Sequence, residues 1–316
     1  MQNWNNEHRE ARQARIAEEP RPGRDTERSA ELLPLERPAH FRQADAPIGV
    51  FDSGAGGLTI LTDLRAELPH ERFIYIGDTA NCPYGVRSDE EITALTLECC
   101  RFLIKQGVKL IIIACNTASQ AALSTLRATL HPLPFIGVVP AVKPAARLTR
   151  NGRIGIAATN QAAKAIYLRQ LIDEFAGGIE AFAVGCPDLV TLVEQGRFEG
   201  PEVEASVKQA LQPVLVEDID VLVLGCTHFP ALRSVIERVV GPKVQVIDSG
   251  QAIARRTRSV LQAEGMFAPT TLLDNGGGEM EIWSSGDPAA FSHVATHILG
   301  LPVQARQATP EIQGAQ

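Results

Sequence analysis

Short apolar runs alternate with longer helical stretches through most of this 316-residue chain, and this alternation limits its fold more than any other feature. Runs that are apolar throughout are typical of parallel strands, because helices cover both faces of their sheet. The sequence therefore predicts an α/β fold of mainly parallel sheets with flanking helices. The expected strands are Ile48–Phe51, Phe73–Ile76, Leu110–Ala114, Phe135–Val139, Ile154–Ala157, Ala181–Val184, Val221–Leu224 and Val244–Ile247, and the expected helices include Glu90–Gln106, Ser119–Leu130 and Pro201–Leu215.

A weak internal repeat relates the two halves of the chain. IGVFDSGAGG begins at residue 48 and IGIAATNQAA at residue 154, an offset of 106 (154 − 48). IIIACNTAS carries Cys115 and LVLGCTHFP carries Cys226, an offset of 111 (226 − 115). Chance matching of apolar strands is the alternative, but the shared spacing favours duplication of a four-strand unit. We therefore expect two similar domains, each with a cysteine after its third strand.

The two ends of the chain differ from this pattern. Residues 1–45 are rich in arginine, acidic residues and proline, and they offer little apolar surface to bury. We expect residues 1–45 and 304–316 to be disordered, which leaves a folded body of about 46–303. The N-terminus also lacks the apolar stretch of a signal peptide.

Composition excludes several classes of protein. A net charge of −7, from 30 basic and 37 acidic residues, gives no general attraction for nucleic acid or for an anionic membrane surface. No apolar run reaches the length of about 18 residues that a membrane-spanning helix needs. Six cysteines in a chain of this length are not a disulfide framework, so free thiols in a reducing cytoplasm are expected.

Unusual residues follow the expected strands, at the edge where open α/β sheets bind ligands. Two of them are Cys115 and Cys226, each of which leaves an apolar run. The positive end of a following helix would lower the thiol pKa modestly from about 8.5, toward neutrality, which suits a group that both gives and takes protons. A cysteine is more often a small buried hydrophobe, and we give that interpretation to Cys99, Cys100 and Cys186. Cys115 and Cys226 are candidate acid–base groups because they occupy equivalent places in the two halves.

Polar residues accompany these thiols. Asp52 and Ser53 end the first strand before a run of glycines, where they either contact a ligand or cap the next helix. His228 lies two residues after Cys226, where it either relays a proton or hydrogen-bonds to the backbone. Amide and hydroxyl groups beside the thiols could bind a carboxylate, together with N–H groups at the helix starts. They belong to Asn116, Thr117 and Thr227.

Three alternative sites are disfavoured. Zinc could bind Cys115, Cys226 and His228, but the chain has no C-x-x-C pair, so we predict no metal site. The glycine-rich turn lacks both the G-x-G-x-x-G order and a following lysine, which argues against phosphate binding. These motifs also contain no lysine for a pyridoxal phosphate Schiff base, so we predict no cofactor.

Five segments together resemble the glutamate racemases of the Asp/Glu racemase superfamily: FDSGAGGLTIL, GDTANCPYG, IIIACNTAS, VGCPDLVTLVEQG and LGCTHFPAL. The likeness extends over about residues 48–302. It implies two α/β domains with the active site in the cleft between them. The first domain would comprise 46–142 and 250–303, and the second 143–249.

The resemblance also implies roles for individual residues. Cys115 and Cys226 would be the catalytic bases, acting on the D and L isomers respectively. Asp52 would assist Cys115, while His228 would assist Cys226 with Glu194 as its acidic partner. The implied substrate contacts are Asp52, Ser53, Tyr84, Gly85, Asn116, Thr117, Thr227 and His228.

The implied function is a cofactor-independent isomerase, a homodimer that interconverts L- and D-glutamate and supplies D-glutamate for peptidoglycan. A relative acting on aspartate, hydantoin or a substituted malonate is the nearest alternative, and a non-catalytic protein that binds a small anion is another. The chain departs from the family pattern at Ala162, where a threonine is usual, and at Asn81-Cys82, where the pair usually begins with arginine. Ala162 removes a hydroxyl from the expected pocket, which weakens the expectation of strict glutamate preference. Residues 1–45 have no counterpart in the family.

Overall fold

The computed structural model describes residues 43–269 and 278–309. The expected disorder of residues 1–42 and 310–316 lies outside the described residues. The prediction of a disordered tail from residue 304 is wrong where the chain is described, because Arg306–Gln307 form strand β10. Arg306 pairs with Trp283, and the Ala308 N–H donates to the Ser284 carbonyl at 2.7 Å, so a sheet edge orders this polar segment.

The first sheet contains strands from both ends of the described chain. Its order is β10-β9-β2-β1-β3-β4, and every pairing is parallel. The strands besides β10 are β1 (Ile48–Asp52), β2 (Phe73–Gly77), β3 (Leu110–Ile113), β4 (Phe135–Gly137) and β9 (Met280–Ser284). Strand β9 was not among the expected strands.

The second sheet is built from the middle of the chain. It comprises β5 (Arg153–Ala158), β6 (Glu180–Gly185), β7 (Val221–Leu224) and β8 (Gln245–Ile247). Its parallel order, β6-β5-β7-β8, matches the order β2-β1-β3-β4 of the first sheet, as duplication of a four-strand unit predicts. Two mainly parallel sheets with flanking helices confirm the predicted fold class, while the domain boundaries at 142/143 and 249/250 stay a prediction.

Helices connect the strands in both sheets. Those next to the first sheet are α2 (Leu58–Glu67), α3 (Asp89–Lys105), α4 (Asn116–Thr129), α11 (Gly250–Glu264) and α12 (Pro288–Leu299), with the short 3₁₀ helix η3 (Tyr84–Val86). Those of the second are α5 (Val142–Leu148), α6 (Asn160–Lys164), α7 (Ile166–Phe175), α8 (Pro187–Glu194), α9 (Pro201–Leu215) and α10 (Arg233–Val240), with the 3₁₀ helix η4 (Phe229–Leu232). Helix α3 begins with a reciprocal cap between Ser88 and Glu91, which fixes its first turn.

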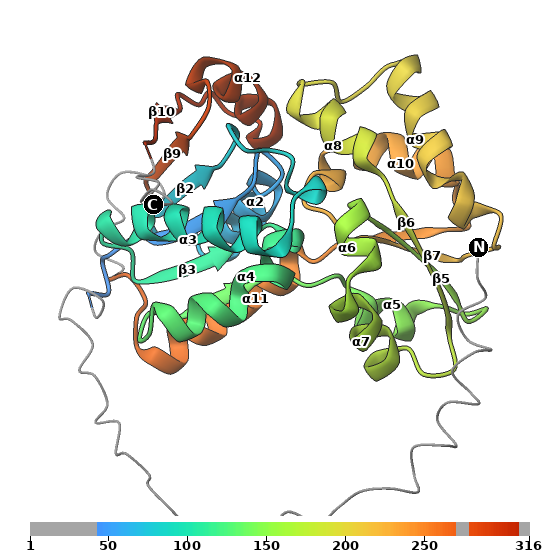
Figure 1. Cartoon of the computed structure of the whole chain (residues 1–316), viewed down its shortest axis with the longest axis horizontal. Coiled ribbons are helices and arrows are strands. Elements are labelled where there is room, and N and C mark those ends of the chain that lie inside the picture. The colour runs from blue at the N-terminus through green and yellow to red at the C-terminus, as the bar shows by residue number, and fades with distance from the viewer. Residues whose placement is uncertain (1–42, 270–277, 310–316) are drawn as a thin grey trace, which may run out of the picture. The chain divides into compact units, whose positions relative to one another are not determined.

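Alternate residues of each central strand enter different apolar cores. Ile48 and Val50 pack into the cluster that contains residues of α2 and α11, whereas Phe51 packs into the cluster that contains residues of α3 and α4. Figure 1 shows these helices around the strands of the first sheet. Because both faces are covered, these strands are apolar at nearly every position. The cluster on the α2 side also includes residues of the second sheet, such as Leu222 and Leu224. Helices of a length and hydrophobicity that would span a membrane do not occur within the described ranges.

Candidate active site

One small cavity is lined by most of the predicted site residues. They come from the carboxyl ends of β1, β3 and β7 and from η3. The predicted residues that line it are Ser53, Tyr84, Gly85, Cys115, Asn116, Thr117, Cys226, Thr227 and His228. Asp52 and Glu194 do not line the cavity but contact residues that do. Both thiols therefore face the same small space from equivalent strands of the two sheets.

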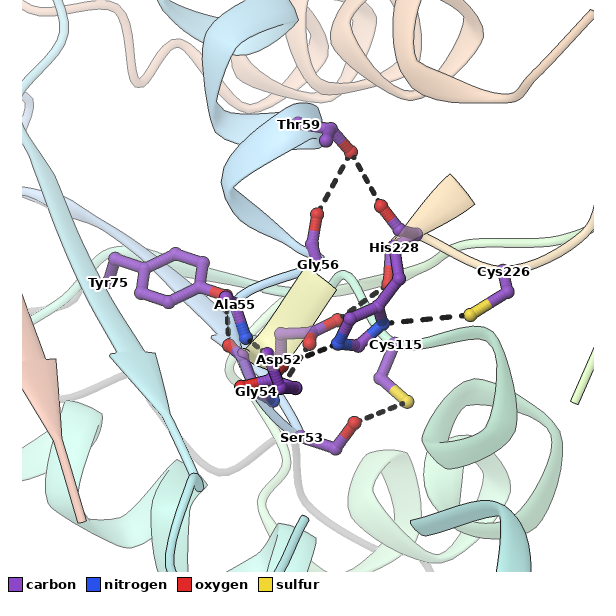
Figure 2. A network of polar contacts seen from close by, with 12 residues as sticks. Asp52, Ser53, Gly54, Ala55, Gly56, Thr59, Tyr75, Cys115, Cys226 and His228 are labelled. Carbon is purple, nitrogen blue, oxygen red and sulfur yellow. Dashed lines mark hydrogen bonds and ion pairs between the residues drawn. The ribbon is translucent and has the colours of Figure 1, made fainter. Parts of the chain in front are cut away.

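Cys115 lies at the N-terminus of α4, as expected. Its Sγ accepts a hydrogen bond from the Ala118 N–H at 3.4 Å, and the Ser53 hydroxyl is also 3.4 Å away (Figure 2). Burial nevertheless raises the pKa of Cys115 to about 12, and the charge of Asp52 adds to this effect. The expectation of a thiol poised near neutrality is therefore corrected, because loss of hydration outweighs the helix terminus and the two hydrogen bonds.

Cys226 follows β7, and the short 3₁₀ helix η4 begins beyond it rather than an α-helix. Its Sγ lies 3.6 Å from Nδ1 of His228, and Nε2 of His228 lies 2.5 Å from Oε1 of Glu194. The same Oε1 accepts from the Ala55 N–H at 2.6 Å. Burial alone would lower the pKa of His228, but its hydrogen bonds to Cys226, Cys82 and Glu194 hold that pKa well above 6.5. Ala55, Glu194, His228 and Cys226 thus form a chain that leads to the second thiol.

Asp52 ends β1 and is completely buried. Its carboxylate accepts from the Gly54 N–H at 2.9 Å and from the Thr227 hydroxyl at 3.0 Å (Figure 2). Burial raises the pKa of Asp52 to about 6, although the neighbouring His228 and these two hydrogen bonds lower it in part. Since Thr59 on α2 also donates to the Thr227 carbonyl at 3.0 Å, the turn after β7 is held by the turn after β1.

The glycines after Asp52 allow this close approach. A Cβ atom on Gly56 would lie 2.5 Å from Nδ1 of His228 and 2.7 Å from Oγ1 of Thr227. Any side chain there would push the two strand ends apart. Gly56 therefore allows the close contact with His228 and Thr227.

Tyr84 and Gly85 place η3 beside the second sheet. The Tyr84 hydroxyl donates to Oδ2 of Asp78 at 2.7 Å, which fixes the loop after β2. A Cβ atom on Gly85 would lie 2.9 Å from Cβ of Thr159, so a glycine is needed for this contact. Both residues line the cavity, as the resemblance implied.

Sequence reasoning missed two residues of this region. Thr159 lines the cavity, and its hydroxyl lies 3.0 Å from that of Thr117. The internal repeat could have identified it, because an offset of 106 pairs Thr159 with Ser53 (159 − 53). Cys82, noted only as a departure from the family pattern, has its thiol beside Glu194 and His228.

Asn116 offers a buried acceptor atom at the cavity. The Asn116 side chain is buried, and its Oδ1 has no hydrogen-bond partner in the part of the chain that the structure describes. A buried polar atom without a partner is costly, so it indicates a place where a ligand donor completes the site.

Comparison with known proteins agrees with this geometry. The family described as Asp/Glu/Hydantoin racemase matches residues 59–257. A glutamate racemase from Herpetosiphon aurantiacus is 44% identical over 250 residues, which cover 79% of this chain and 96% of that protein. The crystal structure of a glutamate racemase isoform from Bacillus anthracis gives a TM-score of 0.75 at 35% identity, over 84% of this chain and 98% of that one. The crystal structure of the glutamate racemase of Francisella tularensis in complex with D-glutamate gives a TM-score of 0.73 at 31% identity. The match covers 85% of this chain and 99% of that one.

Proposed function

The chain belongs to the Asp/Glu/Hydantoin racemase family, and from this premise we propose that it is a glutamate racemase. It is then an isomerase that interconverts L- and D-glutamate without a cofactor. The proposal rests above all on Cys115 and Cys226, which line one cavity from corresponding strand ends of two sheets with the same strand order. Relatives at 37–44% identity carry the same activity in their names.

Racemization without a cofactor needs an acid and a base on opposite faces of the α-carbon. In the L-to-D direction, the Cys226 thiolate removes the α-proton and the Cys115 thiol delivers a proton to the other face. Cys226 ends as a thiol and Cys115 as a thiolate, and the reverse direction exchanges these roles. The high pKa of Cys115 suits the donor role, because this thiol is protonated in the free enzyme at neutral pH.

The surrounding residues support the two thiols. The His228 imidazolium can donate one N–H toward Cys226 and the other to Glu194, so it links the second thiol to a carboxylate. An ionised Asp52 favours the protonated form of Cys115 by charge repulsion with its thiolate. Asp52 assists one thiol and the His228–Glu194 pair the other.

The substrate's own charges match the cavity lining. The unpartnered Oδ1 of Asn116 is an acceptor for the α-ammonium group. The first N–H groups of α4 and the hydroxyls of Ser53, Thr117 and Thr227 are donors for carboxylates. Donors at the α-carboxylate also stabilise the negative charge that develops when the α-proton leaves.

The biological role follows from the product. We propose that the enzyme acts in the cytoplasm as a homodimer and supplies D-glutamate for peptidoglycan synthesis. D-glutamate is the isomer that cell-wall assembly consumes, and a cofactor-free enzyme can make it from the L isomer directly.

The decisive experiment measures racemization by circular dichroism of L-glutamate with purified protein and no added cofactor. Cys115→Ser and Cys226→Ser should each lower kcat by on the order of 1000-fold or more, because a hydroxyl is a far poorer base than a thiolate near neutral pH. In heavy water, the product isomer should carry deuterium at the α-carbon. Wild-type turnover in either variant, or product without deuterium, would contradict the two-thiol mechanism.

Two comparisons separate the alternatives. Assays with both enantiomers of aspartate and of glutamate test substrate choice, to which Ala162 is relevant because it replaces the usual threonine. Alkylation by iodoacetamide should abolish activity, and glutamate should protect against this loss. A non-catalytic anion-binding protein would turn over neither isomer.

A further inference from the structure

A group of potential metal ligands adjoins the substrate cavity: His228 lines that cavity, while Cys82 and Glu194 lie close to His228 but outside the lining. Cys82, Glu194 and His228 each offer one ligand atom, and these three atoms all lie within 4.8 Å of one another. These atoms are a thiol sulfur, a carboxylate oxygen and an imidazole nitrogen. Zinc binds all three types, whereas magnesium and calcium prefer oxygen alone.

The backbone leaves room for this convergence at Gly54. A Cβ atom built there would lie 2.1 Å from Oε1 of Glu194 and 3.0 Å from Sγ of Cys82. The absence of a side chain at Gly54 thus allows the carboxylate and the thiol to approach the same point. Cys82 comes from the loop after β2, Glu194 from the end of α8 and His228 from the turn after β7, so the fold brings together residues that are distant in sequence.

A second cavity gives access to two of these three residues. Cys82 and Glu194 line this second cavity, which extends to α12 and shares Pro83 and Val190 with the substrate cavity, whereas Cys115, Cys226 and His228 line the substrate cavity. The lining of the second cavity includes the carboxylates of Glu194 and Asp287 and, among the described residues, neither lysine nor arginine. A cavity lined by carboxylates without lysine or arginine attracts cations.

We propose that Cys82, Glu194 and His228 bind zinc and that the bound ion inhibits the enzyme; the inhibitory half rests on the proposed function. The Cys82 thiol and the His228 imidazolium each release one proton to solvent, and water completes a four-coordinate ion. The ion takes the place of the proton between His228 and Glu194. Because Nδ1 of His228 also contacts Sγ of Cys226 at 3.6 Å, coordination of the imidazole moves the group that assists this thiol.

Binding is tested first, without substrate, on the full-length protein after treatment with EDTA and dialysis. Cobalt chloride should produce the near-ultraviolet charge-transfer band of a cobalt–thiolate bond, and zinc chloride should remove it by displacement. Cys82→Ala should abolish the band and weaken zinc binding on the order of tenfold or more, since one of three protein ligands is lost. The control is Cys100→Ala, which removes a buried thiol elsewhere. It should leave the cobalt band and the zinc affinity unchanged.

The Cys226→Ser variant distinguishes this site from a zinc site on the two catalytic thiols. The cobalt band should persist in Cys226→Ser if Cys82 is the ligand. Loss of the band there, or its retention in Cys82→Ala, overturns the proposal. If Cys82→Ala does not fold, alkylation of the wild-type protein decides: zinc should protect Cys82 from iodoacetamide, and unprotected labelling contradicts the site.

Inhibition is tested separately by racemization. Zinc should lower kcat with little change in KM, because Cys82 and Glu194 lie outside the lining of the substrate cavity. Relative to its own rate without zinc, Cys82→Ala should need on the order of tenfold more zinc for half inhibition. Activation by zinc, or equal inhibition of wild type and Cys82→Ala, overturns the inhibitory role. Cobalt binding in a protein that does not racemize glutamate would instead contradict the proposed function and leave the metal site standing.

Discussion

At the scale of single residues, burial dominates the protonation of the site. Cys115 and Asp52 both lie next to hydrogen-bond donors that favour their charged forms, yet both have raised pKa values because water is excluded. Sequence position alone predicted the opposite direction for Cys115. A helix terminus and two hydrogen bonds are worth less here than the hydration that the thiolate would lose.

Asp52 gives a pH prediction. Its pKa of about 6 means that the ionised fraction rises between about pH 5 and pH 7. Because the ionised Asp52 carboxylate is the stronger acceptor for the Gly54 N–H and the Thr227 hydroxyl, and so holds Thr227 at the cavity, kcat for L-glutamate should rise with pH through about 6. Asp52→Asn should lower kcat on the order of 100-fold and remove this inflection. The check is a pH–rate profile of both proteins, and an inflection near pH 6 that persists in Asp52→Asn would refute the assignment.

At the scale of elements, α2 packs against α11 with a carboxylate, Asp63, whose ionisation is unfavourable. Asp63 on α2 lies so close to the first residue of α11 that a Cβ atom on Gly250 would be 1.9 Å from its Oδ2. Burial raises the pKa of Asp63 to about 6, and the nearby charge of Asp248 adds to this rise. Arg233 pairs with Asp248 and offsets the repulsion only in part.

The Asp63 carboxyl should therefore destabilise the fold above about pH 6. Between about pH 4 and pH 6 the folded protein holds a proton that the unfolded chain has released, so the free energy of unfolding falls as the pH rises. Asp63→Asn should add about 1 kcal/mol at pH 8, allowing for partial exposure, and nothing below pH 4. Urea unfolding at both pH values measures this.

Asp220→Asn is the matched control of opposite sign. Burial favours the neutral form of Asp220, but hydrogen bonds from Thr149, Arg150 and Asn151 outweigh it and lower the pKa. Ionised Asp220 thus stabilises the fold, and this stabilisation is lost as the pH falls below 4. Asp220→Asn should destabilise the protein at pH 8. If the Asn substitutions at residues 63 and 220 shift stability in the same direction, the electrostatic explanation is wrong.

At the scale of the whole molecule, one buried ion pair joins segments that are far apart in sequence. Lys109, at the start of β3, is fully buried and lies 2.6 Å from Oε2 of Glu71. Its ammonium group also donates to the carbonyls of Ala44 and Met266, at 2.5 and 2.8 Å. The other oxygen of Glu71 accepts from the Ala268 N–H at 2.9 Å. The beginning of the described chain and the segment after α11 are therefore fixed to the amino ends of β2 and β3 in the first sheet.

Removing one partner of this pair should be costly. Lys109→Met should lower the free energy of unfolding by about 3 kcal/mol, because Glu71 is left as an uncompensated buried charge. Adding Glu71→Gln, which keeps the acceptor for Ala268, should recover part of that loss. Urea unfolding of the single and double variants gives the coupling between the two sites. A double variant no more stable than Lys109→Met would show that the ion pair is not the cause.

The sequence by itself determined most of the parallel strands, the repeat and which two thiols line the cavity. Continuous apolar runs and their common spacing are local patterns, and strand ends are where parallel sheets bind ligands, so Cys115, Cys226 and His228 could be found in advance. Tertiary structure decided the rest. The short strand at Arg306–Gln307 exists because β9 offers it an edge, and no pattern in its own residues shows this. The direction of the Cys115 pKa depends on how much water the assembled fold excludes, and the meeting of Cys82 with Glu194 depends on a glycine from a third segment.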